Sequence, residues 1–362
     1  MAFSGIRAPC KIVLLMAIMG TPGPKSSSAV NAQNGSSVKQ EPAPAEIIEV
    51  TRIWDKAPHN AFTDLTFFRD NFYCTFREGT GHVPGKTGSN GQVRVIISGD
   101  GKNWQSRALL KKEGIDLRDP KISITPDQRL MLTIGGSIYK NGVILGRQPQ
   151  VSFSDKLGEN FSDPQPIIMD PNIRTDNDWL WRVTWHQATG YGVVVVFPKT
   201  ASGTESKVLL VKTADGVNYQ LVTRFNVIGS PNEATVRVMS DGEMLILLRR
   251  EADNRHGYLG TAQPPYTQWS WNDTQWRLGG PNFIELPDGR LIVGTRVYTP
   301  DGTFTELFTS DRKGNFQKLL RLPSGKDTSY PGLLFHDGLL WVSYYSGHEE
   351  KTSIYLAKVK LP

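Results

Sequence analysis

The chain has 362 residues, 38% of them hydrophobic, and a net charge of +6. It contains no Lys/Arg-rich block, which argues against a nucleic-acid partner. No apolar run reaches the roughly 18 residues that a membrane-spanning helix needs. The 35 glycines and 23 prolines are scattered along the chain, a composition typical of a turn-rich all-β protein. The mild positive charge suits an anionic ligand.

The N-terminal segment has the features of an export signal. Arg7 and Lys11 precede an apolar run over residues 12–19 that is too short to span a bilayer. Small residues around Ala32 offer a cleavage point. Residues 1–32 are therefore predicted to be a signal peptide, and the protein is expected to be secreted or periplasmic. A short membrane anchor is the alternative interpretation of the same run.

Two regions follow the predicted signal peptide. Residues 33–45 are polar and proline-containing, which predicts a disordered linker, and residues 46–362 are predicted to form a single domain. Cys10 falls within the predicted signal peptide, which leaves Cys74 alone in an apolar strand pattern. No internal disulfide is then possible, and Cys74 is expected to be a buried, inert thiol.

An internal repeat dominates the remaining sequence. An apolar-alternating run, a tight turn and a second β-rich run recur six times, at a period of roughly 50 to 60 residues. Asp-Gly, or a substitute for it, between two such runs is a strong signal for a β-hairpin. The hairpin turns centre near Asp70, Asp127, Gly190, Asp241, Asp288 and Asp337.

Further strands follow each predicted hairpin, such as VRVIIS after the first and KVLLVKT after the third. One such unit cannot bury both of its faces, so six units are predicted to pack radially around an axis. Residues 46–53 form a strand without a hairpin and are expected to complete the last unit, which removes an exposed sheet edge. The expected fold is an all-β, six-bladed β-propeller of four-stranded antiparallel blades.

A second, shorter repeat supports this fold. The segment SGDGKNW at 98–104 matches TADGVNY at 213–219, and looser copies begin at Ser154 and Ser310. In such a turn the aspartate accepts backbone N–H bonds and the glycine tolerates a positive φ. These segments resemble the Asp boxes of bacterial and animal sialidases in a shortened form. The resemblance implies that the aspartates are structural and lie on the propeller rim.

Charged residues collect at matching positions of the repeat. In a propeller the innermost strands converge on the axis, so residues at equivalent strand ends of different blades meet there. The positions about eight residues before the turns hold Phe62, Asp119, Glu233, Gly280 and Ser329, with Tyr330 next. The positions seven or eight residues after the turns hold Arg77, Glu78, Arg249 and Arg296. This sorting predicts a polar site at the axis.

One segment gives this site a specific interpretation. The segment from Asn232 and Glu233 to Arg249 resembles the sialidase segment in which a glutamate is followed by a hairpin ending in arginine. In that family the glutamate polarises a tyrosine nucleophile and the arginine binds the sialic acid carboxylate. Arg296 and Tyr330 continue the family order. The resemblance implies an exo-α-sialidase-like glycoside hydrolase in which Glu233 and Tyr330 form the nucleophilic pair.

Several other residues are candidates for the same site. Arg249 and Arg296 are expected to grip a substrate carboxylate, helped by Arg118 or Arg182, because guanidinium groups bind carboxylates bidentately. Further substrate-binding candidates are Asn232, Trp181, which would stack on a sugar face, and Arg77. Blade packing is the alternative for Trp181, and structural ion pairs are the alternative for Arg77 and Arg182.

Two features depart from the sialidase pattern. The family opens its first blade with Arg-Ile-Pro, whereas the equivalent place at residues 59–62 reads HNAF and has no arginine. The acid/base aspartate of the family has no counterpart either, because no acid stands between Asp127 and Asp155. Asp119 or Glu78 is therefore the candidate for that role.

The same residues allow a different hydrolase. Arg118-Asp119-Pro120 also resembles the Arg-Asp-Pro motif of furanose-cleaving propellers. In this alternative Asp64, Asp119 and Glu233 supply the three carboxylates of an inverting enzyme. Those enzymes have five blades, whereas this sequence contains six repeats. The repeat count therefore favours the sialidase-like interpretation over the furanosidase. A non-catalytic glycan-binding propeller and a protein-interaction scaffold are further alternatives.

Neither a metal nor a cofactor is expected from the sequence. His82, His186, His256 and His348 lack metal-ligand spacing. No Gly-x-Ser-x-Gly elbow occurs. The expected partner is an acidic glycan or glycoconjugate, and the protein is expected to be a monomer.

Overall fold

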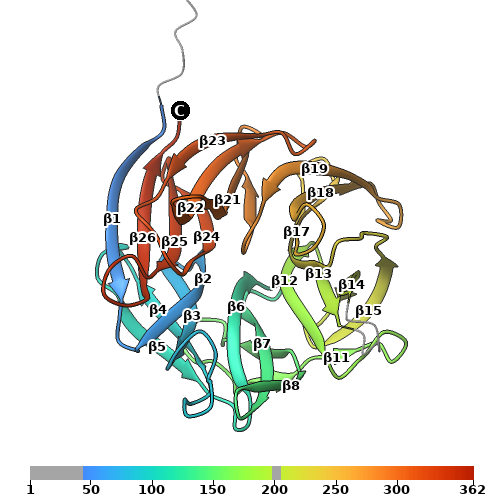
Figure 1. Ribbon diagram of the computed structural model, residues 1–362, viewed down its shortest axis with the longest axis horizontal. Helices are drawn as coiled ribbons and strands as arrows, with labels where there is room; N and C mark the ends of the chain where they lie inside the picture. The colour runs from blue at the N-terminus through green and yellow to red at the C-terminus, as the bar shows by residue number, and fades with distance from the viewer. Residues whose placement is uncertain (1–43, 198–204) are drawn as a thin grey trace, which may run out of the picture. The chain divides into compact units, whose positions relative to one another are not determined.

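The computed structural model describes residues 44–197 and 205–362, which form 26 β-strands and no helix. The strands make six sheets around a common axis (Figure 1). The predicted six-bladed propeller with antiparallel blades is therefore confirmed. The predicted signal peptide and nearly all of the predicted linker lie outside the described residues. Within the described ranges, no helix is long and apolar enough to cross a membrane.

The first three blades run outward from their innermost strands. The first blade consists of β2 (His59–Phe68), β3 (Asn71–Gly79), β4 (Gln92–Ser98) and β5 (Gln105–Leu110). The second consists of β6 (Asp116–Ile124), β7 (Leu130–Lys140), β9 (Gln150–Phe153) and β10 (Gln165–Pro166), with β8 (Val143–Arg147) also paired to β7. The third consists of β12 (Asp178–His186), β13 (Thr189–Val196), β14 (Lys207–Thr213), β15 (Asn218–Arg224) and, parallel to β15, β11 (Ile168–Met169).

The last three blades have four strands each. The fourth consists of β16 (Pro231–Val238), β17 (Met244–Arg250), β18 (His256–Ala262) and β19 (Ser270–Arg277). The fifth consists of β20 (Asn282–Glu285), β21 (Leu291–Thr299), β22 (Gly302–Ser310) and β23 (Phe316–Arg321). The sixth consists of β24 (Thr328–His336), β25 (Leu339–Ser346), β26 (Ser353–Lys360) and β1 (Glu46–Trp54).

The two ends of the domain close the ring within the sixth blade. Strand β1 lies beside β26 (Figure 1) and pairs antiparallel with it. Glu46 lies opposite Lys360 and Trp54 opposite Ile354. The expected role of this first strand is confirmed. Its pairing covers the outer edge of β26, which would otherwise expose a row of unpaired backbone groups.

The hydrophobic core lies between the faces of neighbouring blades. One cluster joins Val195 and Leu210 of the third blade to Ile246 and Leu248 of the fourth, and all four side chains are at most 1% exposed. Consecutive residues of these strands are apolar because both faces of each sheet are covered. Complete burial of each such side chain contributes roughly 1.5–3 kcal/mol of transfer free energy.

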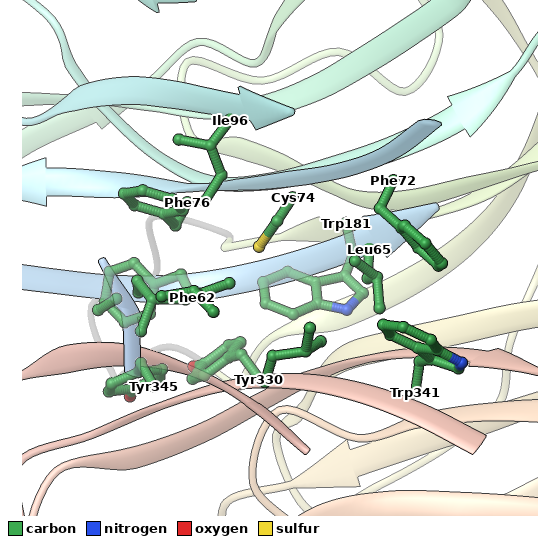
Figure 2. Close-up of a cluster of buried hydrophobic side chains, with 14 residues drawn as sticks. Phe62, Leu65, Phe72, Cys74, Phe76, Ile96, Trp181, Tyr330, Trp341 and Tyr345 are labelled. Carbon is green, nitrogen blue, oxygen red and sulfur yellow. The ribbon is translucent and has the colours of Figure 1, made fainter. Parts of the chain in front are cut away.

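Another cluster surrounds the single described cysteine. Cys74 is fully buried in the first blade, in a cluster with the rings of Phe62, Tyr330 and Trp341 (Figure 2). Burial raises the pKa of the thiol far above its ordinary value. Cys74 is thus a buried and unreactive thiol, as its apolar strand pattern predicts.

The aspartates of the shorter repeat hold turns between the third and fourth strands of their blades. Asp100 accepts hydrogen bonds of 2.8 Å from the backbone N–H groups of Lys102 and Asn103. These bonds lower the pKa of the Asp100 carboxyl. Equivalent bonds to turn N–H groups are made by Asp155, Asp215 and Asp311. These aspartates therefore have structural roles away from the axis.

Candidate active site

The innermost strands are interrupted near their starts by irregular pairing. Phe62, Asp119 and Tyr330 have positive φ angles of 66°, 50° and 50°, which are uncommon for residues other than glycine. Bulges re-aim side chains and are over-represented beside active sites. The shifts in pairing fall between residues 61 and 64, 118 and 121, 180 and 183, 231 and 234, and 329 and 332. Five blades therefore break their strand at the same level of the axis.

Glu233 and Tyr330 form the centre of the site. The Tyr330 hydroxyl donates a hydrogen bond to Glu233 Oε1, although β16 and β24 belong to different blades. Glu233 Oε2 accepts bonds of 2.8 Å from Arg249 Nη1 and from the backbone N–H of Gly280. Glu233 is 2% exposed and Tyr330 is 7% exposed. Three donors thus hold one carboxylate in a nearly buried position.

The surroundings set opposite protonation states for this pair. Burial would raise the pKa of Glu233, but the charge of Arg249 and the bonds from Tyr330 and Arg249 outweigh it, and the pKa is lowered. Burial, followed by the charge of Glu233, raises the pKa of Tyr330 well above 10. A neutral phenol therefore faces an ionised carboxylate, which is the arrangement needed for the carboxylate to accept the phenolic proton.

Gly280 meets the pair from the fifth blade. Its φ is +63°, and a Cβ added there would lie 2.8 Å from Cγ of Tyr330. Only glycine fits this position without strain, because other residues rarely adopt this φ and the aromatic ring is already in place. At this place the fifth blade contributes the backbone N–H of Gly280 as a donor to Glu233, whereas the neighbouring blades contribute side-chain donors.

Arg249 and Arg296 are more exposed than Glu233 and Tyr330. Arg249 forms ion pairs with both Glu233 and Glu251. Arg296 donates to Thr328 O at 2.6 Å and to the Tyr345 hydroxyl at 2.9 Å. Each arginine side chain is 13% exposed. The structure therefore brings Glu233, Arg249, Arg296 and Tyr330 into one site.

The Arg296 guanidinium also approaches the nucleophile candidate and a further acid. Its Cζ lies 5.9 Å from the ring centroid of Tyr330. Its Nη2 lies 3.6 Å from Asp327 Oδ1, which belongs to the segment before β24. Asp327 and Tyr345 were not among the candidates found in the sequence. Tyr345 stands eight residues after the turn at Asp337, the position that Arg249 and Arg296 occupy in their repeats, so the count could have found it, whereas Asp327 lies ten residues before that turn and outside the counted positions.

Asp119 contributes a buried carboxyl from the second blade. It is 1% exposed, and its Oδ2 accepts a bond of 3.0 Å from Arg118 Nε. Its Oδ1 is buried without a hydrogen-bond partner among the described residues. Burial raises the pKa of Asp119 even though Arg118 and Lys121 oppose the shift. Asp119 is therefore closer to the protonated form than an exposed aspartate, as a general acid requires.

Arg118 links Asp119 to the first blade. Its Cζ lies 5.1 Å from the ring centroid of Phe62, and its Nη1 donates to the Tyr139 hydroxyl at 3.1 Å. Phe62 belongs to the segment at residues 59–62, where the sialidase pattern predicts an arginine and this sequence has none. Arg118 of the second blade lies over the Phe62 ring at this place.

Glu78 and Arg77 are held away from the central pair. Glu78 accepts bonds from Arg94 Nη2 at 2.9 Å and from Trp54 Nε1 at 2.6 Å. Arg77 is completely buried and donates to Asp116 Oδ1 at 2.6 Å. No described hydrogen bond or ion pair joins either residue to the Glu233–Tyr330 pair. Their geometry fits structural ion pairs and leaves Asp119 as the better placed acid candidate.

Arg182 and Trp181 belong to the wall beneath the site. Arg182 is 5% exposed and holds both oxygens of Asp64, at 2.6 and 3.1 Å. The Trp181 ring lies 5.5 Å from that of Tyr330, and this residue is only 2% exposed (Figure 2). A sugar cannot stack on a face that solvent does not reach, so blade packing accounts for Trp181. Asn232 is half-buried, and its Oδ1 is without a partner in the described structure.

Lys121 is a site residue that the sequence analysis missed. It is 3% exposed, and its Nζ lies 4.8 Å from the Trp181 ring centroid and 5.3 Å from that of Tyr330. Its only described hydrogen bond goes to Thr63 O at 3.2 Å. Burial lowers the pKa of this amine to about 8. The feature of the sequence that could have indicated Lys121 is a lysine within a strand that is otherwise expected to be buried.

Two cavities on the described part of the protein are lined by residues other than Glu233, Tyr330 and their neighbours. One of about 630 Å³ is lined by Met169, Lys212 and Asp215 at the outer part of the third blade. Another of about 270 Å³ is lined by Arg147, Arg174 and other residues of the second and third blades. We place the candidate site at the axis because the bulges and the perturbed ionisable groups converge there.

Comparisons with known proteins identify the fold class. No protein-family model and no curated protein matches the sequence. A protein of unknown function from Dyadobacter fermentans DSM 18053 superposes with a TM-score of 0.74 at 17% identity, covering 88% of this chain and 99% of that one. A Trypanosoma rangeli sialidase in complex with the inhibitor DANA gives 0.67 at 12% identity, covering 87% of this chain. The chain spans 59% of the length of that sialidase.

A third similar structure is an arabinofuranosidase. The α-L-arabinofuranosidase of Fusarium graminearum superposes with a TM-score of 0.61 at 14% identity, covering 86% of this chain and 98% of that one. The chain therefore has the sialidase-like propeller fold that these glycoside hydrolases share. Since a furanosidase matches over nearly its whole length, blade number does not separate the two hydrolase alternatives.

Proposed function

We propose that this protein is a glycoside hydrolase that removes a terminal acidic sugar, with Tyr330 as the nucleophile. The observation that carries the proposal is the hydrogen bond from the Tyr330 hydroxyl to Glu233, whose other oxygen is held by Arg249. A neutral phenol avoids the repulsion that a carboxylate nucleophile would suffer from a carboxylate-bearing substrate. Sialidases use a tyrosine nucleophile and are an exception to the two-carboxylate rule of glycosidases.

The first half of the reaction forms a glycosyl-enzyme. Tyr330 Oη attacks the anomeric carbon while its proton passes to Glu233 Oε1. The glycosidic C–O bond breaks as Asp119 donates its proton to the leaving oxygen. The raised pKa of Asp119 and the lowered pKa of Glu233 supply the protonation states that these two roles need.

The second half releases the sugar. A water molecule loses a proton to the Asp119 carboxylate and attacks the anomeric carbon. The bond to Tyr330 Oη breaks, and this oxygen recovers its proton from Glu233. Two displacements on the same carbon retain its configuration. The enzyme is returned to its starting state with no other reactant.

Arg249 and Arg296 support the proposal that the substrate is acidic. Both side chains are 13% exposed, and their guanidinium groups can donate to a carboxylate. Glu251 and Asp327 already pair with them, so a substrate carboxylate must share or replace these contacts. We further propose that the enzyme acts as a monomer outside the cytoplasm, on glycans reached through the predicted export signal.

An inverting furanosidase is the second candidate, and the likeness to the arabinofuranosidase propeller favours it. Asp119 and Glu233 would serve as two of its carboxylates. Its third, Asp64, is 1% exposed and bound by Nη1 and Nη2 of Arg182. A carboxylate held in this way is poorly suited to act as a base, so the tyrosine mechanism is preferred.

The test is a panel of fluorogenic glycosides carrying sialic acid, uronic acids and α-L-arabinofuranose. The proposal expects turnover of an acidic glycoside. An analogue of that sugar with a leaving group on the anomeric carbon and fluorine on the neighbouring ring carbon should label Tyr330 in a peptide mass spectrum. Tyr330→Phe should lower kcat by at least about 10³-fold without loss of glycan binding.

Tyr191→Phe is the matched control, because Tyr191 packs on Tyr266 at 5.5 Å, away from the axis, and should leave turnover unchanged. Turnover of the arabinofuranoside alone, with label on neither tyrosine, would select the furanosidase. Glycan binding by wild-type protein without any product would show a non-catalytic propeller.

A further inference from the structure

Three potential metal ligands from distant parts of the chain meet at the mouth of the propeller. His59 begins β2, His82 lies in the segment between β3 and β4, and Asp327 precedes β24. One atom of each residue lies within 4.8 Å of the others. His59 Nε2 is 3.2 Å and His82 Nδ1 is 2.9 Å from the same oxygen, Asp327 Oδ2. Their separation of up to 268 residues along the chain hides this group from a search for ligand spacing.

These separations match the edge of a tetrahedral coordination shell. Bonds of 2.0–2.1 Å from zinc to nitrogen or oxygen place neighbouring ligand atoms about 3.3 Å apart. The two distances to Asp327 Oδ2 therefore need adjustments of only a few tenths of an ångström to admit an ion. The third edge, between the two histidine nitrogens, is at most 4.8 Å, so the two imidazoles would approach each other by at most about 1.5 Å to share the ion.

The segments that carry the histidines are fixed before any ion binds. The buried Arg77 side chain donates to Gly81 O at 2.7 Å and so anchors the residue next to His82. Asn60, next to His59, donates to Thr352 O through both its backbone, at 3.1 Å, and its side chain, at 3.0 Å. A site held in this way loses little conformational entropy when a ligand binds.

Asp327 is oriented by contacts to its other oxygen. The Tyr345 hydroxyl donates to Asp327 Oδ1 at 2.9 Å, and Arg296 Nη2 lies 3.6 Å from the same atom. These contacts hold the carboxylate so that Oδ2 faces the two histidines. Metal-binding carboxylates are commonly oriented by hydrogen bonds of this kind. The positive charge of Arg296 opposes a second cation and sets an upper limit on its affinity.

We propose that His59, His82 and Asp327 bind a divalent transition-metal ion, with Zn²⁺ as the best match. Two imidazole nitrogens and one carboxylate oxygen suit zinc and similar ions, whereas Ca²⁺ and Mg²⁺ prefer oxygen ligands alone. Three protein ligands leave at least one position for water. That position faces the mouth, because the side chains of His82 and Asp327 are 49% and 32% exposed.

One hydrogen bond that commonly orients a metal-binding histidine is missing at His59 in the described structure. His59 Nδ1 is buried without a hydrogen-bond partner among the described residues, so the imidazole has no acceptor behind it. Loss of such a partner costs about 10–100-fold in metal affinity. Moderate, reversible binding is therefore expected, which chelators remove without unfolding the protein.

The test uses the full chain after treatment with EDTA. Zn²⁺ is titrated against a chromophoric chelator, and Co²⁺ is added separately to record its visible absorption. The proposal expects one equivalent of zinc and a tetrahedral Co²⁺ spectrum. His82→Ala and Asp327→Asn should each weaken zinc binding at least tenfold and abolish the Co²⁺ bands.

His256→Ala is the matched control, because His256 also pairs with an aspartate, Asp273, at 3.1 Å on the fourth blade. It should bind zinc like the wild type. Circular dichroism establishes that each variant is folded, and His82 lies on an exposed segment whose change should not affect folding. Wild-type protein that takes up no zinc, or His82→Ala that binds it unchanged, would overturn the proposal. Neither readout depends on glycoside hydrolysis.

Discussion

Lys121 Nζ lies 5.3 Å from the ring centroid of Tyr330, on a strand of another blade. A cation over an aromatic face interacts more strongly as that ring gains negative charge, which is what happens when the phenol gives up its proton. The buried lysine therefore supports Tyr330 electrostatically without a hydrogen bond between them. Its burial also makes the stability of the fold depend on pH.

Lys121→Met should remove a specific pH dependence of stability. The amine has a pKa of about 8 when folded, below its ordinary value of 10.5, so the unfolded chain holds the extra proton between these limits. The wild-type free energy of unfolding should therefore rise relative to that of the variant as pH increases from 8 to 10.5. Urea unfolding at pH 7, 9 and 10 measures this difference, and a constant difference would contradict the prediction.

Gly280→Ala should impair both folding and turnover. The new Cβ would adopt an unfavourable φ and meet Cγ of Tyr330 at 2.8 Å. We expect a loss of about 1–3 kcal/mol in unfolding free energy and at least a tenfold fall in kcat. Gly289→Ala is the control, because Gly289 has a φ of +83° in open space. It should lose stability but no activity, and equal activity of the two variants would refute the claim.

The rate of hydrolysis should be greatest between the lowered pKa of Glu233 and the raised pKa of Asp119. Activity rises with pH as Glu233, whose pKa is lowered, becomes ionised, and it falls with pH as Asp119, whose pKa is raised, loses its proton. A profile of kcat/KM against pH measures both limbs. Asp119→Asn should abolish the falling limb, and a variant that keeps it would show that another group is the acid.

Arg182→Leu should destabilise the protein rather than weaken ligand binding selectively. It leaves the Asp64 carboxylate buried without its partner, which costs about 3–5 kcal/mol. The double variant with Asp64→Asn should recover part of this loss. Arg290→Ala breaks an exposed pair with Asp288 and should cost less than about 1 kcal/mol. A stable Arg182→Leu protein that no longer binds glycan would identify Arg182 as a ligand clamp instead.

The regular features of the fold follow from local patterns in the sequence. Turns at Asp241 and Asp288 set the register of the hairpins that carry Arg249 and Arg296, so counting from each turn places both arginines at one end of their blades. The same count finds Glu233. These residues lie where the count predicts because a strand advances by a constant length per residue.

The irregular features do not follow from such counting. The bulge at Asp119 turns this residue to a buried position beside Arg118, while Glu78, at an equally matching position, pairs with Arg94 instead. Alternation along a strand is reversed by a single unpaired residue, and no turn marks where that happens.

By itself the sequence determined the number of blades, the strand that closes the ring and the level of the axis at which the polar residues lie. Those properties depend on periodic burial and on turn residues, both of which act over a few neighbours in the chain. The tertiary structure alone decided which side chains share contacts: Tyr330 with Glu233, Lys121 beneath Tyr330, and His82 with Asp327. These contacts join residues far apart in the chain, and only the closure of the ring gives their side chains a common position.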